Sequence, residues 1–149
     1  MNITYNNLGV GEATNLVTFT DIPNILKVED NDSGSYARLT IKFKGNLNSV
    51  TSKNGEFYIT FLGESITNVT NPAESVNKHF YIGSVNSTTA AYAARAFRNC
   101  STIAASFKVE NTGDTVVIKA RTVGKVWTGV SNYFQTNIPS DYIDVSATD

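Results

Sequence analysis

The stretch from His79 to Gly124 constrains the fold most, because it predicts a short strand, one small helix and a hairpin in succession. The helix is predicted by four apolar residues at i, i+3, i+4 and i+7: Ala90, Ala93, Ala94 and Phe97. Two segments of alternating polarity, Ser106–Glu110 and Thr115–Arg121, predict strands joined by a turn. We therefore expect a helix at about Thr88–Asn99 whose apolar face packs on the inner face of this hairpin.

Other alternating segments predict further strands. Residues Tyr36–Lys44 place Ala, Leu, Ile and Phe on one face and charged or polar residues on the other, as in an antiparallel sheet. The same reasoning predicts strands at 57–62 and Tyr142–Ser146, and a hairpin between Ile25–Val28 and the Tyr36 strand. Short strands with one helix and no βαβ rhythm predict a mainly β fold: an antiparallel β-sandwich with one short α-helix packed at the side.

The domain organisation predicted for these 149 residues is simple. Residues 1–13 are rich in Asn and Gly and are expected to form a flexible N-terminal arm, and residues 14–149 to form a single β-sandwich domain. Residues Ser65–Lys78 are interpreted as a polar connection, and Trp127–Ser140 as an irregular segment. Because the chain stops directly after a predicted strand, it also suits the N-terminal part of a longer protein.

The charge and the apolar pattern limit the partners. The net charge is −1 and the lysines and arginines are scattered along the sequence, whereas a nucleic-acid interface needs concentrated positive charge. No stretch reaches the roughly 18 apolar residues of a membrane span. We expect neither a nucleic-acid nor a membrane partner, and we expect synthesis in a cytoplasm without a standard N-terminal export signal.

No set of residues points to catalysis. His79, the only histidine, has no second His or Cys near it in sequence, and Cys100, the only cysteine, follows the predicted helix and suits a seam between helix and hairpin. Asp30 and Asp32 resemble the start of a calcium loop, but Ile41 stands where that loop requires a bidentate Glu. The sequence therefore predicts a non-enzymatic protein with no catalytic residues, no cofactor and no metal.

The candidate interface residues are large side chains in the two irregular segments. Tyr and Trp rings dominate many protein interfaces, and they also close the open ends of sandwiches, so both interpretations stand. The predicted interface comprises seven residues: Ile3, Tyr5, Leu8, Val10, Trp127, Tyr133 and Phe134.

One stretch resembles a pattern found in structural proteins of tailed bacteriophages. It comprises Phe80–Gly83, the Thr-Ala helix Ser87–Phe97, Ser106–Val109, Asp114–Ala120 and Thr122–Gly124, about a third of the chain. The pattern is similar to modules of phage tail, sheath and baseplate proteins, and a tail-hub component of the crAss-like phages is one protein of this kind. The resemblance implies a virion component and implies no catalytic residues.

The expected function is therefore that of a structural part of a virion. Only 17% of the residues are charged, and Asn, Ser and Thr are abundant. A surface of this kind suits hydrated, hydrogen-bonded contacts between copies, because identical subunits then repel each other little. We expect a homo-oligomer whose partners are copies of itself and other virion proteins. The alternative function is that of a binding protein: a carbohydrate- or receptor-binding β-sandwich, similar to an adhesin, with a glycan as its partner.

Overall fold

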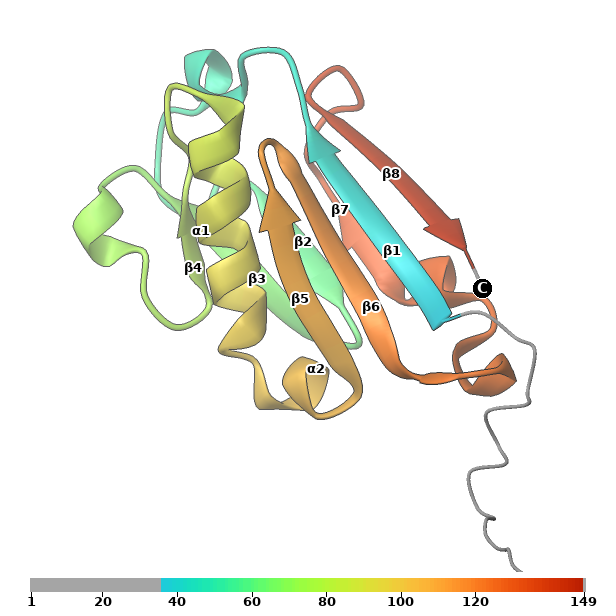
Figure 1. Cartoon of the computed structure of the whole chain (residues 1–149). Helices are drawn as coiled ribbons and strands as arrows, with labels where there is room; N and C mark the ends of the chain where they lie inside the picture. The colour runs from blue at the N-terminus through green and yellow to red at the C-terminus, as the bar shows by residue number, and fades with distance from the viewer. Residues whose placement is uncertain (1–35, 149) are drawn as a thin grey trace, which may run out of the picture. The chain divides into compact units, whose positions relative to one another are not determined.

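The computed structural model describes residues 36–148 and contains two four-stranded sheets (Figure 1). The first sheet is built from β1 (Tyr36–Phe43), β5 (Phe107–Thr112), β6 (Thr115–Val123) and β8 (Ile143–Thr148). The second is built from β2 (Tyr58–Phe61), β3 (Glu64–Val69), β4 (His79–Tyr81) and β7 (Phe134–Thr136). The other elements of the described residues are two helices, α1 (Asn86–Arg98) and α2 (Ser101–Ser106), and four short 3₁₀ helices: η2 (Leu47–Val50), η3 (Pro72–Glu74), η4 (Lys125–Trp127) and η5 (Val130–Tyr133).

The two sheets confirm the prediction of a mainly β sandwich. The strand orders are β5–β6–β1–β8 and β4–β3–β2–β7. All pairs in the first sheet are antiparallel, whereas β3 and β4 pair in parallel, so the second sheet is mixed. Between β3 and β4, η3 and its flanking loops return the chain to the end of the sheet where β3 begins. Because β4 then runs in the same direction as β3, the two strands pair in parallel.

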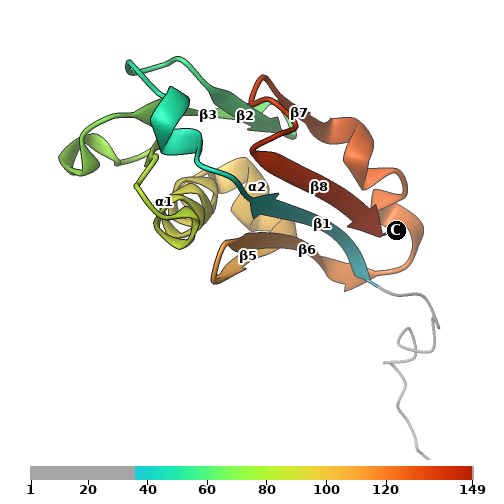
Figure 2. The ribbon, with the colours of Figure 1, turned by 90° about the horizontal axis from the view of Figure 1, so that it is seen from above.

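The helix α1 packs as its spacing predicts. Its three alanines Ala90, Ala93 and Ala94 and its Phe97 are all buried. The small side chains let α1 approach the sheets closely, and it contacts β5 and β6 as well as β4. Figure 2 shows α1 between the β3 side of one layer and the β5 side of the other, so the helix lies within the open side of the sandwich.

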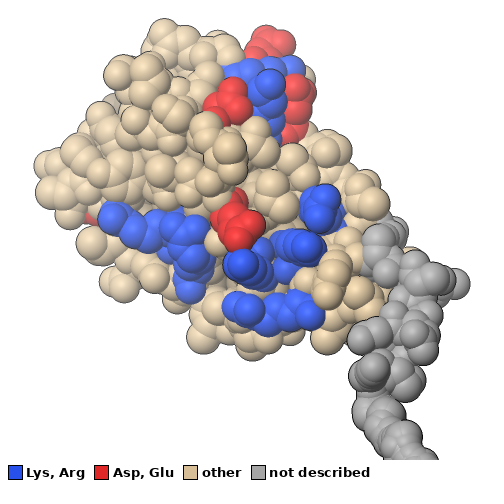
Figure 3. Space-filling view, viewed as in Figure 1, with Lys and Arg blue, Asp and Glu red and all other residues tan. Residues whose placement is uncertain are grey.

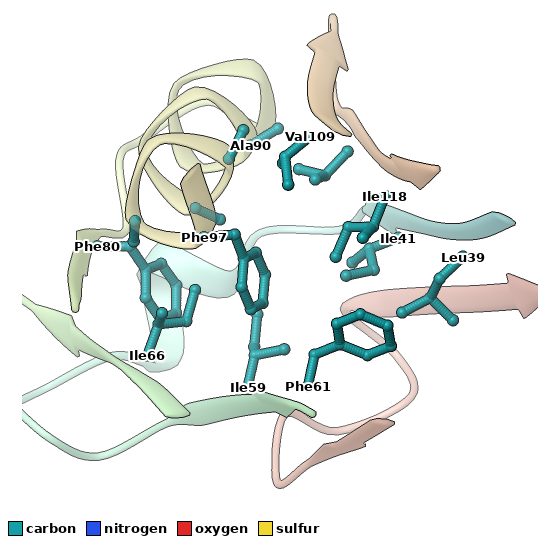
Figure 4. Close-up of a cluster of buried hydrophobic side chains, with 14 of the residues drawn as sticks. Leu39, Ile41, Ile59, Phe61, Ile66, Phe80, Ala90, Phe97, Val109 and Ile118 are labelled. Carbon is teal, nitrogen blue, oxygen red and sulfur yellow. The ribbon is translucent and has the colours of Figure 1, made fainter. Parts of the chain in front are cut away.

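The core joins both sheets and α1. Figure 4 shows Phe97 pointing from α1 toward Ile59 and Phe80, with Ile41 and Ile118 contributed by the first sheet. All five side chains are completely buried. These long-range contacts, rather than helix propensity, hold a helix of 13 residues in place.

Two of the segments expected to be irregular contain strands. The polar connection predicted at 65–78 is wrong in its first half, because β3 occupies Glu64–Val69 and turns back from β2 through Leu62 and Gly63. The segment 127–140 contains η5 and β7, and β7 pairs with β2. A second helix, α2, was not predicted. The arm 1–13 and the strand Ile25–Val28 lie outside the described residues.

Candidate functional site

Among the described residues, the strand β8 is an open edge of the first sheet. Lys44 N–H donates to the Tyr142 carbonyl at 3.0 Å, so residues 142, 144, 146 and 148 are the ones that exchange hydrogen bonds with β1. The N–H and C=O groups of Ile143, Val145 and Ala147 therefore point away from β1. Within the described part of the chain, these backbone groups have no hydrogen-bond partner.

The inner face of β8 is also incompletely covered. Ile143 is buried, but Val145, which lies opposite the completely buried Ile41, is 38% exposed, and Ala147 is exposed as well. The second sheet ends at β7, a strand of only three residues. Beyond Ile143, the edge strand therefore offers both free backbone groups and apolar side chains to a partner.

The opposite edge of the same sheet, β5, is protected. Arg98 of α1 donates from Nη1 to the Val109 carbonyl at 3.0 Å, and α1 lies alongside β5. Covering an edge with a helix is a common way to prevent strand addition. The two edges of this sheet thus differ, since α1 lies along β5 whereas no described strand pairs with the free edge of β8.

The predicted aromatic cluster is only partly an exposed surface. The Trp127 ring is half-buried and lies 4.8 Å from the buried Phe107 ring and 6.0 Å from Tyr133, measured between centroids. Phe134 is also half-buried, and it pairs with Phe61 across β2 and β7. Tyr133, which is 43% exposed, is the most accessible ring of the three. The structure therefore packs Trp127 and Phe134 against the core and leaves Tyr133 at the surface.

The four predicted interface residues of the arm, Ile3, Tyr5, Leu8 and Val10, lie outside the described residues. The same holds for Asp30 and Asp32 of the calcium-like turn. The interface predicted for the arm and the interpretation of the calcium-like turn therefore stay predictions.

His79 and Cys100 occupy ordinary structural positions. His79 is exposed at the start of β4, and its Nδ1 lies 3.0 Å from the Thr67 hydroxyl. Cys100 is buried between α1 and α2, and its thiol donates weakly to the Ala96 carbonyl at 3.5 Å. Burial raises the pKa of the Cys100 thiol, which disfavours the reactive thiolate.

A shallow hollow of about 480 Å³ lies over the outer side of α1. We call it the α1 hollow, and its lining combines two arginines, one aromatic ring and several polar groups: Ser87, Thr88, Ala91, Tyr92, Arg95, Arg98 and Asn111. Arg95 donates to the Ser75 carbonyl at 2.6 Å, and its guanidinium lies 4.8 Å from the centre of the Tyr92 ring. Both arginines are thus held by backbone carbonyls at the surface of the fold.

Next to the α1 hollow, three cations lie side by side on the outer face of the first sheet. Lys108 of β5 is directly opposite Lys119 of β6, which is directly opposite Arg38 of β1. We call these three residues the basic row. Figure 3 shows Lys and Arg atoms gathered over this face, with few acidic atoms among them. Like charges directly opposite each other destabilise a sheet, and Glu110 offsets part of that repulsion here, because its carboxylate pairs with Lys108 at 2.9 Å and interacts electrostatically with Lys119.

The sequence alone did not indicate the basic row or the α1 hollow. The cations are scattered in sequence, and the alternating pattern of their strands was the available signal, because Arg38, Lys108 and Lys119 all occupy polar outward positions. Among residues 36–148, the ion pairs are Lys44–Asp144, Lys78–Glu64 and Lys108–Glu110. Within the described chain, Arg38, Arg95 and Arg98 form no ion pair with a carboxylate, whereas Lys119 interacts electrostatically with Glu110.

Other classes of site find no support in the described residues. Within 36–148, no group of three or more His, Cys, Asp or Glu side chains is placed to hold a metal ion. None of the helices there is long and apolar enough to cross a membrane. In comparisons with known proteins, no family model and no curated protein matches this chain.

Proposed function

We propose that the chain is a non-enzymatic structural component of a bacteriophage virion, in the tail, tail hub or baseplate, that assembles with copies of itself and with neighbouring virion proteins. The observation that carries the assembly role is the open edge of β8. The resemblance of the α1–β5–β6 region to phage structural modules supports the virion assignment.

The chemistry of β8 favours strand addition. An exposed edge is normally protected by Pro, by Lys or by a bulge. The sequence of β8, Ile-Asp-Val-Ser-Ala-Thr, contains neither Pro nor Lys, and its single charge, Asp144, is paired with Lys44 at 2.8 Å. A strand from a neighbouring copy could therefore bond to Ile143, Val145 and Ala147 without meeting an unpaired charge.

Proline substitution tests the role of this edge. In Val145→Pro the lost N–H is one that points away from β1, so we expect the fold to persist while strand addition stops. Wild-type protein should form oligomers in sedimentation velocity experiments, and Val145→Pro should sediment as a monomer with nearly unchanged circular dichroism.

The matched control is Ser146→Pro. Its lost N–H belongs to the β1–β8 ladder, so this variant should lower the melting temperature. Assembly of Val145→Pro to the same extent as wild type would contradict the role of β8.

The virion assignment has its own test. Mass spectrometry of purified phage particles should detect the chain in a stoichiometric ratio to other tail proteins. Its absence from particles, while it is present in the infected cell, would contradict the assignment and leave the β8 result unaffected.

A further inference from the structure

The α1 hollow combines groups that suit an acidic sugar. Arg95 and Arg98 are exposed residues that each use one N–H on a backbone carbonyl, so each guanidinium keeps further N–H donors for a ligand. Guanidinium groups bind carboxylates and phosphates in bidentate geometry. Ser87, Thr88 and Asn111 add hydroxyl and amide groups that both donate and accept, as sugar hydroxyls require.

The basic row extends this positive surface across three strands. Arg98, at the α1 hollow, bonds to the carbonyl of Val109, the residue after Lys108, so the hollow borders the row. Neighbouring strands lie about 5 Å apart, so Lys108, Lys119 and Arg38 present charges at regular short intervals. Glu110 neutralises part of this charge, and the three cations still leave the row net positive, so an anionic chain with repeated charges can bind along it.

We propose that the α1 hollow binds an acidic sugar unit of an anionic polysaccharide, with its carboxylate or phosphate held by Arg95 and Arg98 and the rest of the polymer running along the basic row. The volume of about 480 Å³ is that of a small-ligand site. This binding activity is separate from assembly through β8.

The surface fits a polysaccharide better than a nucleic acid. Single-stranded nucleic acids stack their bases on aromatic rings. On this side of the described chain, Tyr92 already carries Arg95 over its ring, and Tyr36 carries Lys119 at 4.5 Å. Phosphate contacts alone would use the basic row and leave the hydroxyl and amide groups of the hollow without a role.

Binding measurements with defined polymers test the proposal. Biolayer interferometry would compare polygalacturonate, a phosphorylated mannan, neutral dextran and a short DNA duplex at low and physiological salt. We expect the chain to bind at least one of the two anionic polysaccharides about tenfold more tightly than dextran or DNA. The polygalacturonate and phosphomannan signals distinguish carboxylate from phosphate recognition. Equal binding of all polymers, or tightest binding of DNA, would overturn the proposal.

Two pairs of variants locate the site. The double variant Arg95→Gln/Arg98→Gln should lose about tenfold in affinity. Lys53→Gln/Lys78→Gln removes the same charge outside the α1 hollow and should change the affinity less than about twofold. Ala91→Glu adds a carboxylate to the hollow at an exposed position, and Ala91→Gln adds the same volume without charge. Loss of binding in Ala91→Glu but not in Ala91→Gln is expected, and equal effects of these two substitutions would contradict the site.

Discussion

At the scale of single residues, Phe97 connects the helix to both sheets. It is completely buried, and it lies at the end of a stripe of alanines that cannot fill the space in its absence. We predict that Phe97→Ala lowers the free energy of unfolding by about 3–5 kcal/mol, because the change removes a buried ring and leaves a cavity. Chemical denaturation monitored by circular dichroism measures this difference.

The control for this prediction is Phe97→Leu, which retains part of the buried volume and should be markedly less destabilising. If Phe97→Ala destabilises the protein no more than Phe97→Leu does, then Phe97 is not the anchor of α1.

At the scale of elements, a buried amide holds the turn before β2 against β3. Asn68 is completely buried, its Oδ1 accepts from Phe57 N–H at 2.7 Å, and its Nδ2 donates to the Lys53 carbonyl at 3.0 Å. We predict that Asn68→Ala destabilises the fold by about 1–3 kcal/mol, because it leaves a buried donor and an acceptor without partners. Hydrogen exchange should show reduced protection of the Phe57 amide.

Thr70→Ala is the comparison for Asn68→Ala. Thr70 bonds the exposed Asn54 side chain near the same turn, so its loss should have a much smaller effect. Unchanged protection of Phe57 in Asn68→Ala would show that the amide does not hold this turn.

At the scale of the whole molecule, three glutamates make stability depend on acid pH. The pKa of Glu56 is lowered mainly by the Ser52 backbone N–H, that of Glu64 by Lys78, and that of Glu110 by Lys108. A lowered pKa in the folded state stabilises the fold above the ordinary value of 4.5, and this contribution is lost as pH falls through the lowered value. We predict that the melting temperature is level near neutral pH and falls below about pH 4.5.

Differential scanning calorimetry between neutral pH and pH 3 measures this dependence. Glu56→Gln should show a shallower decrease than wild type, because its side chain no longer titrates. A melting temperature that stays constant in acid, or a curve for Glu56→Gln that parallels wild type, would contradict this account.

Local pattern predicted most of the regular elements. The alternation in β1 and β6 and the apolar spacing in α1 each lie within one short segment, so neighbouring residues carry the signal. The strand β3 was missed because its polar Asn68 is buried through hydrogen bonds rather than exposed. Its turn was also hidden, because Leu62 adopts a φ of 55°, where Asn or Gly is usual in a two-residue hairpin loop.

The sequence by itself determined the class of fold and the buried faces of α1, β1 and β6, because side-chain periodicity is a local property. Only the tertiary structure decided that, within residues 36–148, β8 is an open edge while α1 lies along β5, because strand order depends on contacts between distant segments. The same holds for the basic row. Arg38, Lys108 and Lys119 are far apart in sequence, and the register of three paired strands places their charges side by side.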